Sequence, residues 1–364
     1  TKRDQPAQQP AEHHHPAAPH TGKNQPGGRE DTRADHIGHN DAGRCAQPEL
    51  ASQSAWRRGT GGLVQGRVLF LRKRVPQKLT LPDRQTSIVF SLPTERLNVR
   101  AEARRGSVLD RIVEARRAAV AHRKRVLPEA VLRLAVEKGT PVRDFPGALT
   151  CLGTNIIAEL KKASPSRSLL RDNFDPRSLA VQLEQAGAAA LSVLTEEEFF
   201  QGSLESLRTA RKTTALPVLR KDFIFDPWQV WETRATDADS FLLIAAILDD
   251  SLLRELLHLG RVLGMEPLAE VHTREEIARA IDAGTQIIGI NNRDLRTLEV
   301  RMETSFELIE LLPDDCIAVC ESGLHSAEEL ARLRAAGFDA FLIGEHLMES
   351  ADPAAALRKL LEAG

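Results

Sequence analysis

Eight short apolar runs recur between residues 156 and 344, and each is followed by a stretch whose apolar positions repeat at helical spacing. Because the runs are almost continuously apolar, we expect parallel strands covered on both faces. The predicted strands are Ile156–Leu160, Ala190–Leu194, Pro217–Lys221, Ser240–Ile244, Pro267–Val271, Gln286–Ile290, Ile317–Glu321 and Ala340–Gly344. Eight strand–helix units in about 210 residues predict an α/β fold, a (β/α)8 TIM barrel at the small end of its usual size.

Start and stop signals flank several of the intervening helices. A helix is expected to begin where a side chain can accept free backbone N–H groups, and to end near a glycine. These signals are Asp175-Pro176 with Gly187, the capping boxes Thr273–Glu276 and Ser326–Glu329, and the closing glycines Gly284 and Gly337. One helix follows the eighth strand, so we expect no second catalytic domain.

Two further helices are predicted before the barrel. Apolar residues from Val108 to Val120 recur at helical spacing, and Pro128 opens a second helix that runs through Glu137. We therefore predict one domain over residues 106–364, with an N-terminal helical extension at 107–140. Residues 1–105 are predicted to be a low-complexity, partly basic tail that is disordered, because its composition cannot bury enough apolar surface.

Composition narrows the class of protein. The chain has 364 residues, 42% of them hydrophobic, and a formal net charge of -2, which gives no general reason to expect nucleic acid as a partner. The basic stretch at 56–105 contains no RNA-binding motif, and the histidines at 13–15 lack the spacing of a metal site. No apolar run is long enough to span a membrane. The four cysteines show no CxxC pair and no regular disulfide spacing, so we expect a cytoplasmic protein.

Charged residues stand at the carboxyl ends of the predicted strands, where a barrel of this kind carries its active site. Side chains two apart on a strand share a face, so Glu159 and Lys161 should point the same way. The other strand ends supply Lys221, Glu270, Asn291 with Arg293, and Glu321. Because bringing so many charges together without a function is unfavourable, we predict a catalytic cluster at the barrel mouth.

A phosphate site is predicted beside this cluster. Ser322-Gly323 follows the seventh strand and Gly344-Glu345 follows the eighth, where such barrels bind phosphate through backbone N–H groups. Ser164, after the first strand, adds a hydroxyl donor.

Several segments together resemble the indole-3-glycerol phosphate synthase family, in order, from about Ser107 to the C-terminus. They are Ile157-Ala158-Glu159-Leu160-Lys161-Lys162-Ala163-Ser164-Pro165-Ser166, Ser192-Val193-Leu194-Thr195-Glu196, Phe200-Gln201-Gly202-Ser203, Pro217-Val218-Leu219-Arg220-Lys221-Asp222-Phe223, Gly289-Ile290-Asn291-Asn292-Arg293-Asp294-Leu295 and Glu321-Ser322-Gly323. Ser168 departs from the family, which usually has glycine there.

The resemblance implies an enzyme of tryptophan biosynthesis, a carboxy-lyase that converts 1-(2-carboxyphenylamino)-1-deoxyribulose 5-phosphate to indole-3-glycerol phosphate, carbon dioxide and water. It implies Lys221 as general acid, Lys161 as partner of the substrate carboxylate and second acid, and Glu270 as base, with Glu159 assisting. It places Asn291, Glu321, Arg293, Ser164, Phe200 and Ser322 against the substrate, and Ser322, Gly323, Gly344 and Glu345 against the phosphate. No metal or organic cofactor is implied, and the expected partner is a small phosphorylated molecule. The chain is expected to be a monomer that associates with other tryptophan-pathway enzymes.

Other sugar-phosphate enzymes on this fold are the alternatives. Phosphoribosylanthranilate isomerases use a cysteine on the first strand, where this chain has Glu159 and Lys161. Histidine-pathway isomerases of amino-sugar phosphates place acids as Glu159 and Glu270 are placed, but do not need Lys161 and Lys221. A phosphate-binding protein without catalysis would be indicated by loss of a motif residue, and none is lost.

Overall fold

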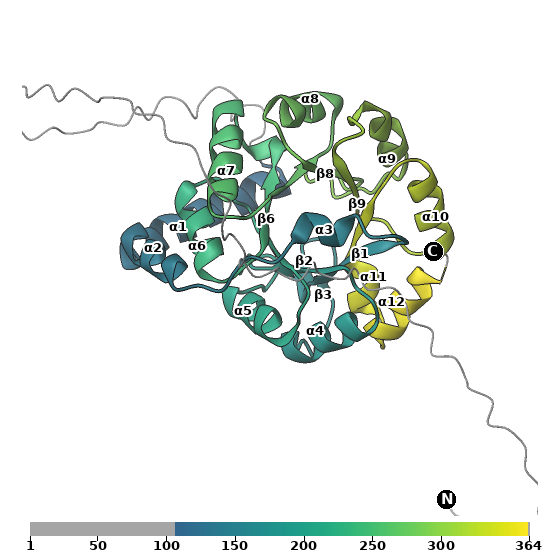
Figure 1. Cartoon of the computed structure of the whole chain (residues 1–364), viewed down its shortest axis with the longest axis horizontal. Helices are drawn as coiled ribbons and strands as arrows, with labels where there is room; N and C mark the ends of the chain where they lie inside the picture. Colours follow the sequence, from purple (N-terminus) through teal and green to yellow (C-terminus); the bar gives the residue numbers. More distant parts are fainter. Residues whose placement is uncertain (1–105, 363–364) are drawn as a thin grey trace, which may run out of the picture. The chain divides into compact units, whose positions relative to one another are not determined.

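The computed structural model describes residues 106–362, and their strands form a closed parallel barrel (Figure 1). Neighbouring strands pair in parallel around the ring, and β10 closes it on β1. The barrel strands are β1 (Asn155–Leu160), β4 (Ala190–Leu194), β5 (Val218–Lys221), β6 (Ser240–Ile244), β7 (Leu268–Val271), β8 (Ile287–Asn291), β9 (Ile317–Glu321) and β10 (Ala340–Ile343). The TIM barrel prediction is confirmed, with several strand ends shifted by one residue. The predicted tail, residues 1–105, lies outside the described residues.

Helices on the outside of the ring begin largely at the predicted caps. They are α4 (Pro176–Gln185), α5 (Leu204–Thr213), α6 (Pro227–Ala235), α7 (Asp250–Val262), α8 (Arg274–Asp282), α9 (Glu303–Leu308), α10 (Ala327–Ala335), α11 (Glu345–Glu349) and α12 (Pro353–Leu361). The Ser326–Glu329 capping box is confirmed. The predicted box at Thr273 is wrong in one half, because the Glu276 carboxylate accepts the N–H of His272 instead of the N–H of Thr273. The single helix predicted after the last strand is also wrong, since the short α11 precedes α12.

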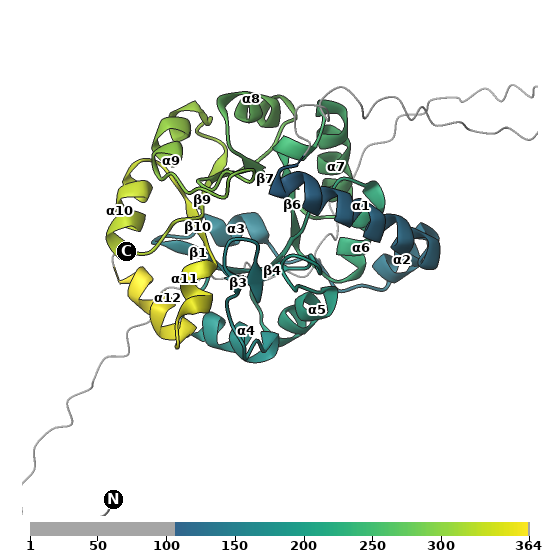
Figure 2. The ribbon, with the colours of Figure 1, turned by 180° about the vertical axis from the view of Figure 1, so that it is seen from behind.

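The helices that precede the barrel take opposite ends of it. The predicted pair is confirmed as α1 (Val108–Val126) and α2 (Glu129–Glu137), and α2 packs on α6. A short helix that the pattern did not predict, α3 (Phe145–Leu149), lies over one end of the barrel in Figure 1. Figure 2 shows α1 in front when the molecule is turned round.

Alternation along the strands divides the core into two layers. Inward residues such as Ile157, Leu219 and Val319 fill the barrel together with Phe145 of α3 and Leu109 of α1. The apolar filling therefore runs from the helix at one end to the helix at the other.

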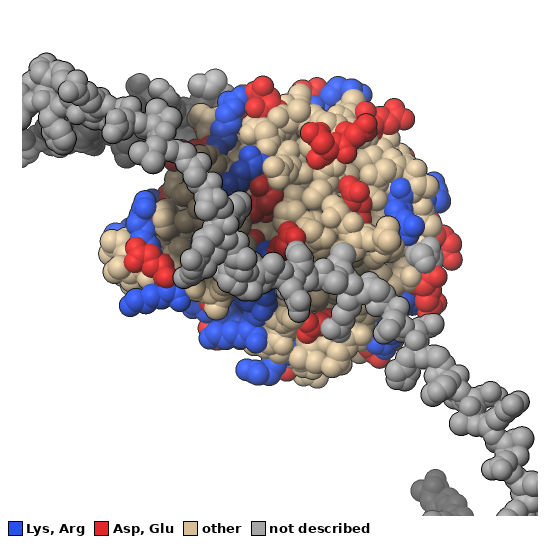
Figure 3. Space-filling view, in the orientation of Figure 1, with Lys and Arg blue, Asp and Glu red and all other residues tan. Residues whose placement is uncertain are grey.

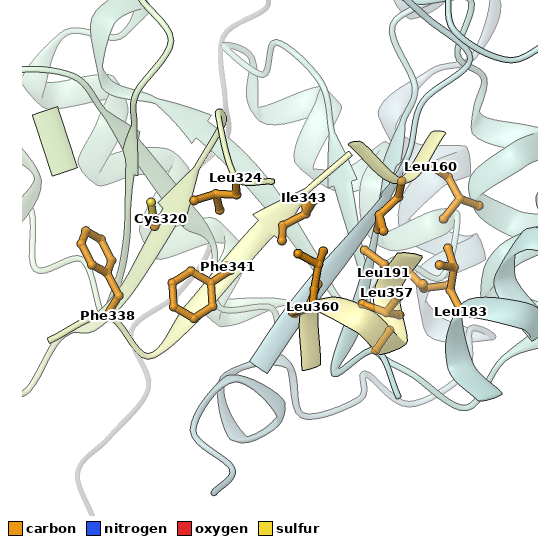
Figure 4. Packing of buried hydrophobic residues seen from close by; sticks show 14 of the residues in the cluster. Leu160, Leu183, Leu191, Cys320, Leu324, Phe338, Phe341, Ile343, Leu357 and Leu360 are labelled. Atoms are coloured by element: carbon orange, nitrogen blue, oxygen red, sulfur yellow. The ribbon is translucent and has the colours of Figure 1, made fainter. Parts of the chain in front are cut away.

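Outward residues pack beneath the helices. Figure 4 shows Phe341 and Ile343 of β10 facing Leu357 and Leu360 of α12. Cys320 belongs to this outer layer and Cys316 packs against it. The thiol of Cys320 is buried, which raises its pKa to about 12.

The surface seen in Figure 3 carries both signs of charge among the described residues, with Lys and Arg interspersed with Asp and Glu. Neither sign forms a continuous field over the part of that face that residues 106–362 supply. None of the helices described here combines the length and the apolar character that crossing a membrane requires.

Candidate active site

A cavity of about 300 Å³ opens at the carboxyl ends of the strands. Every residue that the sequence predicted for catalysis, substrate binding or phosphate binding lines it. These are Glu159, Lys161, Ser164, Phe200, Lys221, Glu270, Asn291, Arg293, Glu321, Ser322, Gly323, Gly344 and Glu345. The alternation of inward and outward side chains explains why the strand ends converge on one space.

Lys221, the last residue of β5, lies at the centre of the cluster. Its Nζ donates to Glu270 Oε2 on β7 at 2.9 Å and to Glu321 Oε2 on β9 at 2.7 Å. Burial alone would lower the pKa of Lys221, but the charges on Glu270 and Glu321 outweigh it and raise that pKa well above its usual range. The amine is therefore held as an ammonium group.

The two carboxylates that hold Lys221 differ in their own titration. Burial favours the neutral form of Glu270, but Lys221 and His272 outweigh burial and hold the pKa of Glu270 below its usual value. Burial raises the pKa of Glu321 to about 7, and the neighbouring Glu270 adds to the rise that Lys221 opposes. Two carboxyl groups whose pKa values are driven apart are suited to different roles near neutral pH.

Lys161 and Glu159 form a second pair at the end of β1. Their side chains point to the same side, as predicted, and Lys161 Nζ lies 2.9 Å from Glu159 Oε1. Two glycines make room for the carboxylates. A Cβ at Gly344 would lie 2.3 Å from Glu159 Oε1, and one at Gly289 would lie 2.1 Å from Glu321 Oε1. Glycine is required at both positions by these close approaches.

Arg293 links two sides of the mouth. Its N–H donates to Asn291 Oδ1 at 2.9 Å, and its guanidinium lies 2.9 Å from Glu345 Oε2. Arg167, from the loop after β1, lies 3.0 Å from the other oxygen of Glu345. The Glu345 carboxylate thus bridges two arginines, so any contact of this residue with phosphate has to be made by its backbone N–H.

An apolar wall faces the charged cluster. It contains Leu109 and Ile112 of α1 with Phe200 and Phe223, whose ring centroids lie 6.2 Å apart. Glu196 fixes the loop that carries Phe200, because its carboxylate accepts the N–H groups of residues 198, 199 and 200. The cavity therefore offers a flat apolar surface opposite charged groups.

Backbone strain is found at two loops of the site. Ser322 (φ +68) and Gly323 (φ +78) follow β9 in the left-handed region, which a serine seldom adopts. Ser168 (φ +54) follows a turn closed by Arg167 N–H to Ser164 O at 3.2 Å, in the small hairpin of β2 (Ala163–Ser164) and β3 (Ser168–Leu169). A left-handed residue is typical after such a turn in a three-residue hairpin loop, and glycine suits it best.

Residues 109–360 match the family model described as indole-3-glycerol phosphate synthase, which is more than half of the chain. The chain belongs to the indole-3-glycerol phosphate synthase family. It is therefore a carboxy-lyase of tryptophan biosynthesis, and the amino-sugar phosphate isomerases are not favoured. This confirms the resemblance drawn from the strand-end motifs.

Curated relatives agree with the family match. The indole-3-glycerol phosphate synthase of Koribacter versatilis is 48% identical over 258 residues, covering 70% of this chain and 99% of the relative. That of Albidiferax ferrireducens is 44% identical over 257 residues, covering 70% and 97%. A solved 3-hexulose-6-phosphate synthase from Salmonella typhimurium has a TM-score of 0.48 and 11% identity over 58% of this chain and 98% of its own, too distant to bear on activity.

Some residues of this synthase site were not singled out from the sequence. The leading helices resemble the family's N-terminal extension that helps to cover the site, but Leu109 and Ile112 were not assigned to the cavity individually. Arg167 lies in a loop where nothing local indicates a contact with the cavity. His272 follows a strand end but has no motif around it. Among residues 106–362 no group of three or more His, Cys, Asp and Glu side chains is placed to hold a metal ion.

Proposed function

We propose that the chain closes the indole ring of 1-(2-carboxyphenylamino)-1-deoxyribulose 5-phosphate with the residues of this cavity. The observation that carries the assignment is Lys221, held as an ammonium group between Glu270 and Glu321 at the barrel mouth. The reaction needs an acid beside the ribulose carbonyl, and the cavity has this one.

In the first step the aromatic carbon that bears the carboxylate attacks the ribulose carbonyl carbon. A carbon–carbon bond forms, and Lys221 donates its proton to the carbonyl oxygen, which becomes a hydroxyl. The carboxylate then leaves as carbon dioxide, and the electrons of the broken bond restore the aromatic ring. Lys161 binds the carboxylate until that bond breaks.

In the second step the new hydroxyl leaves as water. Lys161 donates the proton that the leaving oxygen requires, and Glu270 takes the proton whose loss completes the indole. Glu159 lies 2.9 Å from Lys161 and assists its proton transfer. Asn291 and Glu321 orient the anilino nitrogen and the hydroxyls, while Phe200 and the apolar wall receive the aromatic ring.

The phosphate is bound on the far side of the mouth. Backbone N–H groups of Ser322, Gly323, Gly344 and Glu345 contact it, with Ser164 beside them, while Arg293 and Arg167 offset the charge of the Glu345 carboxylate. The strained backbone at Ser322 supports this assignment, because strain of this kind concentrates at functional sites.

Fluorescence-detected indole formation tests the reaction directly. The full chain should convert the carboxyphenylamino substrate, and Glu270→Gln should lower turnover by roughly 10² to 10⁴, the usual worth of one acid–base group. Conversion of an amino-sugar phosphate in place of this substrate, followed by proton NMR, would assign the chain to the alternative class.

The phosphate assignment has its own test. A Cβ at Gly323 would lie 2.6 Å from Val300 Cγ1, at a φ that side chains seldom adopt, so Gly323→Val should displace the loop. We expect a raised KM and loss of inhibition by inorganic phosphate, since remote binding energy orients the reacting centre. Unchanged phosphate inhibition would place the anion elsewhere.

We also propose that the chain acts as a monomer in the cytoplasm, beside other enzymes of tryptophan synthesis. The family's place in a biosynthetic pathway supports this setting. Light scattering coupled to gel filtration measures the oligomeric state.

A further inference from the structure

His272, directly after β7, lies in the wall between two cavities. It lines a second cavity of about 300 Å³ together with Glu276, while Glu270 lines the main one and Asn291 lines both. Its Nε2 lies 3.4 Å from Glu270 Oε1, and its Nδ1 lies 3.4 Å from Glu276 Oε2. The imidazole thus stands in line between a buried carboxylate of the active site and a carboxylate of α8.

Glu270 uses its two oxygens on different partners. Oε2 accepts the hydrogen bond from Lys221, while Oε1 and His272 Nε2 are both buried and have no hydrogen-bond partner at standard geometry within the described part of the chain. The two atoms face each other at 3.4 Å. A small shift brings them into hydrogen-bond contact, which makes each the available partner of the other.

The charge balance of the cluster also favours a contact between Glu270 and a positively charged His272. Three carboxylates, Glu159, Glu270 and Glu321, face two ammonium groups, Lys161 and Lys221. A buried net negative charge is unfavourable and drives carboxylates to take up protons. A cationic imidazole at residue 272 completes the balance.

The groups around His272 favour its charged form. The charges with the largest effect on it are acidic, and acidic groups face it from four neighbouring elements: Glu270 on β7, Glu276 on α8, Glu321 on β9 and Asp294 after β8. The cationic side chains that line the same cavity as His272 are Arg296 and Arg301. Burial lowers the pKa of His272, but the hydrogen bond to Glu276 and the charge on Glu270 outweigh it and raise that pKa.

We propose that His272 is a positioning residue for the reaction, which as an imidazolium keeps Glu270 ionised and holds its Oε2 toward Lys221. The proposal rests on the proposed role of Glu270 as the base. A purely structural role, in which His272 only joins β7 to the start of α8 through Glu276, predicts different kinetics.

The test compares pH profiles of kcat and KM for the full chain and His272→Gln, which keeps a polar side chain but removes the charge. Without the imidazolium, Glu270 binds a proton up to higher pH, so the acid limb of kcat should move up by about one pH unit, roughly tenfold in kcat at pH values below the pKa of Glu270. KM should change less than twofold, and the two profiles should converge at higher pH, where Glu270 is ionised in both proteins. His272→Lys should restore part of the activity on the acid limb.

Matched controls separate charge from folding. His258→Gln makes the same chemical change at an exposed position on α7 and should leave the profile unchanged. A uniform loss of kcat at all pH values, with no recovery in His272→Lys, would overturn the proposal in favour of the structural role. An acid limb that stays in place would overturn it as well.

A second measurement holds even where a variant fails to fold. NMR of the imidazole nitrogens in the unsubstituted chain reports the titration of His272, whose pKa should lie above the ordinary value of a histidine; a pKa below that value would overturn the proposal. Failure of the base assignment is distinguishable, because Glu270→Gln would then retain near-parent turnover whatever His272 does.

Discussion

Neighbouring residues of β5 serve two charge clusters with opposite properties. Lys221 points into the barrel mouth, where its side chain is 14% exposed and meets Glu270 and Glu321. Arg220 and Asp222, on either side of it in the chain, are fully buried and pair with each other. One strand end therefore supplies residues to two clusters, the proposed catalytic cluster around Lys221 and a structural cluster around Arg220 and Asp222.

The structural cluster holds each charge in one state. Asp222 Oδ2 accepts from Arg116 of α1 at 2.5 Å, from Arg220 at 2.8 Å and from the Thr195 hydroxyl at 2.6 Å. Burial would raise the pKa of Asp222, but Arg116 and Arg220 outweigh it and hold that pKa below its usual value. A carboxylate with this many donors has no reason to exchange a proton near pH 7.

The catalytic cluster does the opposite with similar groups. Carboxylates there outnumber the lysines, so they compete, and the pKa of Glu321 rises to about 7 while that of Glu270 falls. The comparison teaches that burial of charge alone does not indicate catalysis. A shortage of positive partners does indicate catalysis, because it leaves one carboxyl group ready to change its protonation.

The largest effect should come from Lys221→Met. Turnover should fall by roughly 10² to 10⁴ because the acid is lost. The melting temperature should change less than in the variant of the structural cluster described next, since Glu321 can take up a proton. Lys212→Met, exposed on α5, is the control. Near-parent indole formation in Lys221→Met would exclude it as the acid.

Arg220→Met should act on stability first. It removes one partner of both Asp222 and Glu232 in a fully buried cluster, which costs about 3–5 kcal/mol. At roughly 2–4 °C for each kcal/mol, the melting temperature should drop by about 10 °C or more. Calorimetry checks this, and a drop no larger than that of Lys221→Met would abolish the distinction between the clusters.

Glu321→Gln should lower kcat and raise the melting temperature, the latter in a pH-dependent way. The pKa of Glu321 is about 7 in the folded chain, against a usual value near 4.5, so the folded state binds the extra proton between these values. Stability of the parent then falls as pH rises through that window and stays reduced above it. The variant should melt about 7–14 °C higher than the parent at pH 8 and at nearly the same temperature near pH 4.5, while kcat falls. A difference that does not vary with pH would contradict the raised pKa.

The smallest effect is expected away from both clusters, at Ser168. Ser168→Gly removes the left-handed strain at φ +54, which costs an ordinary residue about 1–2 kcal/mol, partly offset by the greater freedom of glycine when unfolded. We expect a gain of about 0.5–1 kcal/mol in urea unfolding. Ser168→Ala keeps the strain and should show no gain.

Much of the fold followed from periodicity. The eight strands were predicted because apolar runs bounded by cap residues are local signals, and the ends of strands in a barrel must meet. Helix α3 was not predicted, because its five residues include Pro146 and Gly147 and are too few to show a helical period. The short helix α11, which follows the last strand and precedes α12, was not predicted for the same reason, since it spans only one turn.

The site was predictable as a set of residues but not as a set of contacts. Glu345 illustrates this, since the sequence places it after the last strand without showing that Arg167, 178 residues away, pairs with its carboxylate. The Arg116–Asp222 pair joins residues 106 positions apart and leaves no local pattern. His272 is similar, because its meaning depends on the distance to Glu270 and on the charges around both.

Helix α1 has a consequence for how this enzyme can change over generations. The charged half of the cavity is built into the strand ends and the loops that follow them. Part of the apolar half comes from Leu109 and Ile112, on a helix that lies outside the strand–helix repeat. Mutation at these two positions can reshape the surface that meets an aromatic ring while the acid and the base stay in place. The part of the apolar surface that α1 supplies is thus encoded apart from the charged strand ends and is open to selection independently of them.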